Sequence, residues 1–161
     1  MSYQNISSRA AGVVIYNNHL LVIYRKKNTS IYYTFPGGTV EIDESIQAAV
    51  AREVLEETSI QVQINNLLYQ FDIISDASVK RECFYDCNYI SGIPALKSDS
   101  IEFSRSNDNN MYQPMWIPID KLSEIKLYPL EVRDRVINDL KNGFEQQTSY
   151  ISVQKSQMRN T

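Results

Sequence analysis

The sequence predicts one α/β domain in which a mixed β-sheet is packed between helices. The chain has 161 residues, of which 43% are hydrophobic and 22% are charged. This balance suits a single globular domain and excludes a disordered or collagen-like chain. Strand-like and helix-like segments follow one another in the order strands, helix, strands, helix, and this order is typical of a sheet covered by helices.

A β-hairpin is expected at the start of the chain. Residues 9–16 and 20–25 are rich in Val, Ile and Tyr, and two asparagines at 17–18 separate them. Asparagine tolerates the left-handed backbone that a tight hairpin turn requires. Residues 32–35 then form a short aromatic strand, which the Pro-Gly-Gly run at 36–38 is expected to end.

The first helix is predicted over residues 45–58, which contain no Gly or Pro and are rich in Ala, Glu and Leu. Either Asp43 or Ser45 can cap its start, because both side chains accept hydrogen bonds from free backbone N–H groups. One stripe of the helix is expected to pack on the sheet: Ala48, Ala51 and Leu55.

The second half of the chain repeats the strand and helix pattern. The predicted elements are strands at 67–74 and 82–90, a polar mobile loop at 98–110, a strand at 114–119 and a helix at 130–140. We therefore predict a domain over residues 6–142. Residues 143–161 are rich in Gln, Ser and Asn and are expected to form a polar C-terminal tail with weak structure.

The net charge and the small number of histidines and cysteines argue against several functions. The net charge of −3 gives no positive field for a nucleic acid polymer. The single histidine, His19, and the cysteines Cys83 and Cys87 are too few for a structural zinc site and make histidine-based nucleophilic catalysis improbable. Both cysteines are expected to be buried apolar residues. No segment resembles a signal peptide or a membrane span, so a cytoplasmic protein is expected.

Three glutamates are the first candidate residues for a functional site. Glu53, Glu56 and Glu57 stand at positions i, i+3 and i+4 of the predicted helix, so they project from one face. The plain alternative is a solvated acidic face. However, Ile46, Ala49 and Val50 continue this face toward the helix start as apolar surface, so part of it is expected to be covered. The preceding Pro-Gly-Gly run also lets the backbone approach a ligand closely, and clustered glutamate oxygens suit Mg²⁺ or Mn²⁺.

The three glutamates belong to a longer pattern, Gly-x5-Glu-x7-Arg-Glu-apolar-x-Glu-Glu-x-Gly-apolar. Eight of its nine specified positions are present here: Gly38, Glu44, Arg52, Glu53, Val54, Glu56, Glu57 and Ile60. This stretch resembles the Nudix box of a known family, the Nudix (MutT-like) hydrolases. The aromatic-Pro-Gly-Gly run before the box and a late Trp-x-Pro strand at 116–118 also fit the family. The resemblance implies the Nudix α/β/α sandwich.

One position departs from the box. Ser59 stands where the family has glycine, which would end the helix in a left-handed conformation. A side chain there costs about 1 kcal/mol. On this basis Ser59→Gly is expected to stabilise the protein by a few tenths to about 1 kcal/mol, because glycine's freedom in the unfolded chain offsets part of the gain.

The resemblance also implies roles for individual residues. Glu53, Glu56, Glu57 and the Gly38 carbonyl would hold the metal, and Arg52 would orient the glutamates. Glu57 or Glu56 is expected to be the general base, and Glu102 in the polar loop is the alternative. Residues expected to contact substrate are Arg25 and Lys27, for phosphates, and Phe35 and Trp116, for stacking on a base or ribose.

The implied activity is hydrolysis of the diphosphate linkage of a nucleoside diphosphate bonded to a group X, with Mg²⁺ or Mn²⁺ as cofactor. A nucleoside triphosphate, in its ordinary or an oxidised form, is the favoured substrate, and the protein is expected to be a monomer or homodimer. The alternatives are a nucleotide-sugar or ADP-ribose pyrophosphatase, a nucleotide-binding module without catalysis, and an isoprenoid diphosphate isomerase. The proline and tyrosine that mark two Nudix subfamilies are absent, because Asp76 and Ser78 stand there.

Overall fold

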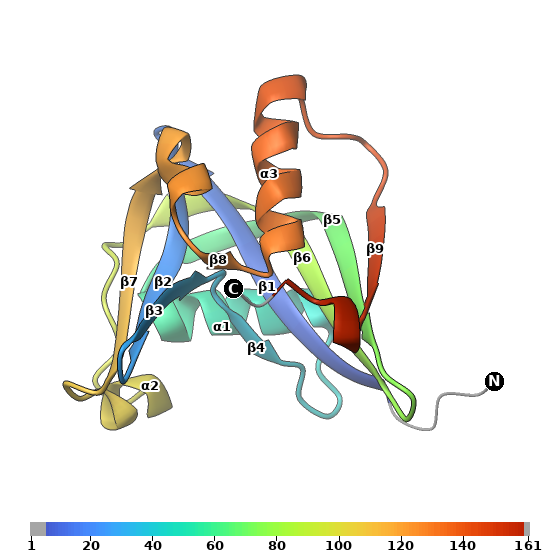
Figure 1. Ribbon diagram of the computed structural model, residues 1–161. Helices are drawn as coiled ribbons and strands as arrows, with labels where there is room; N and C mark the ends of the chain where they lie inside the picture. The colour runs from blue at the N-terminus through green and yellow to red at the C-terminus, as the bar shows by residue number, and fades with distance from the viewer. Residues whose placement is uncertain (1–5, 160–161) are drawn as a thin grey trace.

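The computed structural model describes residues 6–159, which form a curled mixed sheet with helices on both faces (Figure 1). The elements are β1 (Ile6–Tyr16), β2 (His19–Lys27), β3 (Ser30–Thr34), β4 (Gly37–Thr39), α1 (Ile46–Thr58), β5 (Gln61–Ile74), β6 (Val79–Ser91), α2 (Ile101–Arg105), β7 (Asn110–Pro118), the 3-10 helix η1 (Ile119–Glu124), β8 (Leu127–Tyr128), α3 (Leu130–Asn142), β9 (Ser149–Gln154) and the 3-10 helix η2 (Lys155–Gln157).

The sheet has nine strands in the order β8-β3-β2-β1-β6-β5-β9, with β4 also paired to β1 and β7 to β2. Strand β1 lies near the centre, antiparallel to β2 and parallel to β6. The predicted hairpin is confirmed, and its turn residues Asn17 and Asn18 both have positive φ, 48° and 58°. Such left-handed pairs match the twist of the strands that they join.

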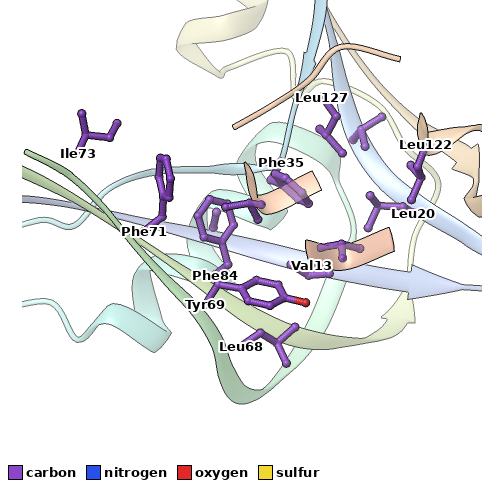
Figure 2. Packing of buried hydrophobic residues seen from close by; sticks show 14 residues of the cluster. Val13, Leu20, Phe35, Leu68, Tyr69, Phe71, Ile73, Phe84, Leu122 and Leu127 are labelled. Carbon is purple, nitrogen blue, oxygen red and sulfur yellow. The ribbon is translucent and has the colours of Figure 1, made fainter. Parts of the chain in front are cut away.

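Alternate residues of β1 point into two separate hydrophobic cores. Ala11 and Val13 belong to the core beneath α3, whereas Ala10 and Val14 belong to the core beneath α1. Figure 2 shows part of the first core. Because successive side chains of a strand face opposite sides, one sheet can support a helix on each face. The predicted α/β/α arrangement is confirmed.

The packing face of α1 differs from the predicted stripe. The helix buries Ala49, Val50, Val54 and Thr58, while Ala48 is exposed. The valines bury more apolar area than an alanine stripe would, and burial of such side chains stabilises a fold by roughly 1.5–3 kcal/mol each. As a consequence, the glutamates lie at the edge of the buried face and not opposite it.

Two further segments, the Pro-Gly-Gly run and the polar loop, are more ordered than the sequence indicated. The glycines after Pro36 form β4, which pairs antiparallel with β1. The polar loop contains α2, whose N-cap Ser100 accepts a hydrogen bond from the backbone N–H of Phe103 at 3.1 Å.

The expectation of weak structure in the C-terminal tail is wrong. Strand β9 pairs in parallel with β5, and the partly buried side chains of Ile151 and Val153 pack against the core beneath α3. The alternation of polar and apolar residues in this strand suits a half-buried edge position.

Cys83 and Cys87 are both free thiols and 2% exposed, as predicted. Within residues 6–159, no helix has the length and apolar character needed to cross a membrane.

Candidate active site

Helix α1, which carries the acidic residues, is well defined at both ends. The Ser45 hydroxyl accepts a hydrogen bond from the Ala48 N–H at 3.1 Å, so Ser45 is the cap. At the other end Ser59 has φ 62° and ψ 15°, and its N–H donates to the Leu55 carbonyl at 2.9 Å. The left-handed helix end expected from the box is therefore present with serine in place of glycine.

The acidic face of α1 lines a polar cleft of about 890 Å³. Strand β4 supplies Gly37 and Gly38, β2 supplies Arg25, and α2 supplies Glu102. The cleft thus brings together most of the residues that the sequence singled out: Arg25, Gly38, Arg52, Glu53, Glu56, Glu57 and Glu102.

Arg52 organises the carboxylates of this cleft. Its Nε and Nη2 donate to the two Glu44 oxygens at 2.8 and 3.0 Å, and its Nη1 donates to Glu53 Oε1 at 2.7 Å and Glu56 Oε2 at 3.3 Å. Nη2 also donates to the Thr39 carbonyl at 3.1 Å. The hydrogen bonds from Arg52 lower the pKa of Glu44 to about 2. Protein acceptors therefore use all of the hydrogen-bonding capacity of this guanidinium, as expected for a residue that orients the neighbouring carboxylates.

Glu57 is the most deeply placed carboxyl group of the site. Its Oε2 accepts a hydrogen bond from the Gly37 N–H at 3.0 Å. Burial raises its pKa to about 8, and the nearby charges of Glu53 and Glu102 raise it as well. Burial also raises the pKa of Glu53. Burial thus disfavours the ionised form of both carboxyl groups, and at Glu53 the Arg52 guanidinium opposes that effect.

Gly38 allows the backbone to approach the acidic helix. A Cβ atom at this position would overlap the Glu53 carboxylate. Only glycine fits here without displacing that side chain, so the backbone of β4 contacts α1 beside the Glu53 carboxylate.

The donor set of the cleft suits a hard divalent cation. Carboxylate and carbonyl oxygens are the ligands that Mg²⁺ and Mn²⁺ prefer, and a cation would favour the ionised form of Glu57. As the side chains stand, no group of three or more His, Cys, Asp or Glu residues between residues 6 and 159 converges closely enough to hold a metal ion. In this arrangement Arg52 engages Glu53 and Glu56, and Glu57 accepts from Gly37.

Arg25 faces the cleft between two aromatic rings. Its guanidinium carbon lies 3.5 Å from the Tyr112 ring centroid and 5.8 Å from that of Tyr32. Its Nη2 donates to Asn110 Oδ1 at 3.1 Å. Cation–π contacts of this kind fix the direction of the charge toward the cleft. Neither tyrosine was identified from the sequence, because strand register sets both contacts: β3 places Tyr32 opposite Arg25 on one side, and β7 places Tyr112 opposite it on the other.

Three residues expected to contact substrate do not line the acidic cleft. Lys27 is exposed at the end of β2. Trp116 packs against Tyr16 and Tyr89, with ring centroids 6.1 and 5.9 Å apart, and it lines neither the acidic cleft nor the cavity of about 620 Å³ described below. Phe35 is 3% exposed. The face of the sheet on which each of these side chains lies is set by strand alternation and register.

A second cavity of about 620 Å³ adjoins the acidic cleft and shares Arg9, Tyr32 and Thr34 with it. Phe35 contributes to the lining of this cavity and packs edge-on against Phe84, with ring centroids 5.2 Å apart. Arg9 was not predicted as a site residue. Its guanidinium donates to the Gly37 carbonyl at 3.2 Å and lies where the two cavities meet.

The fold and the acidic cleft define a class of protein. A Nudix hydrolase from Nitrosomonas europaea has the same fold, with a TM-score of 0.72 at 16% identity over 96% of this chain and 82% of that one. An ADP-ribose pyrophosphatase structure from Streptococcus suis superposes with a TM-score of 0.60 at 14% identity, over 91% of this chain and 98% of that one. Both likenesses show the fold alone.

Sequence similarity gives the family. The NUDIX domain matches residues 7–139, and the chain belongs to the Nudix family. A MutT-like protein from Streptomyces ambofaciens is 28% identical over 130 residues, 80% of this chain and 75% of that protein. An ADP-ribose pyrophosphatase from Methanocaldococcus jannaschii is 38% identical over 58 residues, 35% of this chain and 34% of that protein. The predicted family and enzyme class, a Nudix pyrophosphohydrolase, are confirmed.

Proposed function

We propose that this protein is a hydrolase of the diphosphate linkage in a small nucleoside diphosphate derivative and depends on Mg²⁺ or Mn²⁺. One observation carries the proposal: Glu53, Glu56 and Glu57 face a single cleft together with Gly38 and the orienting Arg52. The family to which the chain belongs generally uses divalent metal ions and small nucleotide substrates.

The cleft residues divide the work of the reaction. Glu53, Glu56, Glu57 and the Gly38 carbonyl would hold the cation. When bound, a cation supplies charge neutralisation of the diphosphate and a lower pKa for the attacking water. A carboxylate of the cleft takes the proton from that water; Glu57 and Glu56 are the candidates on α1, and Glu102 is the candidate on α2.

Arg25 and Arg52 have different tasks in this proposal. Arg25 lies in the cleft with its charge held between Tyr32 and Tyr112, and it can pair with a phosphate of the substrate. Arg52 keeps the glutamates aligned through its hydrogen bonds. An active site whose charges are already oriented does not have to reorganise when charge develops on phosphorus.

A nucleoside triphosphate, in its ordinary or an oxidised form, remains the substrate that we favour. ADP-ribose is the second candidate, because a relative and a similar structure are both named ADP-ribose pyrophosphatases. A binding module without catalysis fits less well, since the box carboxylates are all present. We keep the reducing cytoplasm as the compartment because the two cysteines are free thiols.

Turnover of a substrate panel tests the proposal. The four nucleoside triphosphates, an oxidised guanosine triphosphate, ADP-ribose and a nucleotide sugar would be incubated with Mg²⁺ and read by phosphate released after a coupling enzyme. Glu56→Gln should lower turnover by about 100-fold or more, because one carboxylate of the charge-stabilising cleft is lost. Glu124→Gln, a change of a 61% exposed side chain, is the matched control and should retain full activity. Unchanged turnover in EDTA would refute the metal-dependent mechanism.

A further inference from the structure

The cavity beside the acidic cleft is partly built by residues beyond the family match. The NUDIX domain match ends at residue 139, yet Met158 lines this cavity of about 620 Å³. Because the cavity and the cleft share Arg9, Tyr32 and Thr34, a molecule with its phosphates in the cleft can extend its other end into the cavity.

Residues 155–159, named here the C-terminal strap, are held in place at both ends. At one end β9 pairs with β5, placing Ile73 opposite Val153. At the other end Arg159 lies 2.9 Å from Asp134 Oδ2 and 3.5 Å from Glu131 Oε1, both on α3. Between these anchors Met158 is partly buried against the core beneath α3.

The cavity offers aromatic surface together with a polar edge. Phe35 and Phe84 meet at 5.2 Å between centroids, and Tyr128 lies on another side of the cavity. Lys80 and Glu82 form an ion pair at 3.4 Å in the same lining. A planar ring can pack on aromatic and thioether surfaces, and the ion pair provides both donors and an acceptor for polar atoms on the edge of such a ring.

We propose that the C-terminal strap, through Met158, supplies one wall of the cavity that takes the nucleobase of the substrate, and that residues beyond the family match thereby set the base preference of this chain. The inference rests on the proposed function, because phosphates held in the acidic cleft direct the base past Arg9 into the cavity. The strap therefore contributes to affinity and base preference and has no part in bond cleavage.

Binding without turnover tests this proposal. The affinities of AMP, GMP, CMP and UMP would be compared with that of ribose 5-phosphate, which has no base, by calorimetry in the absence of metal. Wild-type protein should bind at least one monophosphate about tenfold more tightly than ribose 5-phosphate. Met158→Ala should remove most of that preference, about fivefold, by deleting apolar contact. It should leave ribose 5-phosphate binding unchanged.

Two further variants separate a lost wall from a lost fold. Arg159→Ala releases the strap at an exposed position and should weaken the base preference in the same direction. Gln157→Ala changes an exposed neighbour outside the cavity lining and should have no effect. An unfolding midpoint measured for each variant shows that the fold is retained.

Two results would overturn the proposal: equal binding of ribose 5-phosphate and all four monophosphates, or an unchanged base preference in both Met158→Ala and Arg159→Ala. A base preference that depends on the strap, in a protein that hydrolyses no member of the substrate panel, would instead refute the proposed function and leave the base site standing.

Discussion

Replacing Glu57 by glutamine should stabilise the metal-free protein while it removes activity. In the folded state burial raises the pKa of Glu57 to about 8, against a reference of 4.5. The folded state therefore holds the proton more tightly than the unfolded state does. As pH rises from 4.5 to 8, unfolding releases this proton, and the free energy of unfolding falls. Glutamine does not titrate, so the variant lacks this fall.

The size of the effect follows from this pKa difference. Each pH unit between the two values is worth about 1.4 kcal/mol, so the ionisable side chain costs about 3 kcal/mol of stability at pH 7. The oxygen of glutamine can still accept from the Gly37 N–H, but its buried amide N–H groups cost about 1 kcal/mol. Glu57→Gln should therefore raise the free energy of unfolding by about 2 kcal/mol at pH 7 and by little at pH 5.

Urea unfolding in EDTA at pH 5, 6, 7 and 8 measures this difference. Glu124→Gln is the control, and it should change stability by under about 0.5 kcal/mol at every pH, because an exposed ion pair contributes little. Added Mg²⁺ should stabilise wild-type protein more than Glu57→Gln, which has one carboxylate fewer. Parallel pH profiles for wild type and Glu57→Gln would show that Glu57 is ionised in the folded protein, and the reasoning would fail.

Three other changes test the site. Ser59→Gly relieves about 1 kcal/mol of backbone strain, but the Ser59 hydroxyl donates to the Ala95 carbonyl at 2.7 Å. The variant loses this bond, worth about 1 kcal/mol, and glycine adds freedom to the unfolded chain. The net effect should be a free energy of unfolding about 0.5 kcal/mol lower, which revises the gain expected from the sequence alone. A gain of 1 kcal/mol in urea unfolding would contradict this. Arg52→Lys should lower kcat about tenfold and raise the Mg²⁺ concentration for half-maximal rate, since an ammonium cannot replace the planar guanidinium; an unchanged Mg²⁺ requirement would argue against an orienting role. Gly38→Ala should lower turnover by about tenfold or more by displacing Glu53, and an unaltered rate would show that the strand yields.

Much of the acidic site is predictable from the sequence because it is local. The helix period places Glu53, Glu56 and Glu57 on one side of α1, whatever surrounds the helix. The same period brings Arg52 within reach of Glu56 at i+4, and the structure has this ion pair at 3.3 Å. The chemistry of a divalent cation likewise follows from the kind of side chain alone.

The depth to which the same glutamates are buried was not predictable in this way. The sequence favoured Ala48, Ala51 and Leu55 as the packing stripe, whereas the helix packs through Val50 and Val54. A helix with apolar residues on more than one side can turn toward the sheet in several ways, and the contacts of the whole core select one of them. This orientation of the helix buries the Glu57 carboxyl group, and burial raises its pKa.

Residue type and spacing were enough to fix the family, the order of the elements and the acidic face of α1. The tertiary structure alone decided which distant side chains join that face. It brought Arg9 and Glu102 to the cleft, kept Trp116 away from it, and placed Met158 in the adjoining cavity. The physical reason is that strand register sets the face on which a side chain lies, and a shift of one residue reverses it. Register depends on pairing between segments far apart in the chain, which local periodicity does not record.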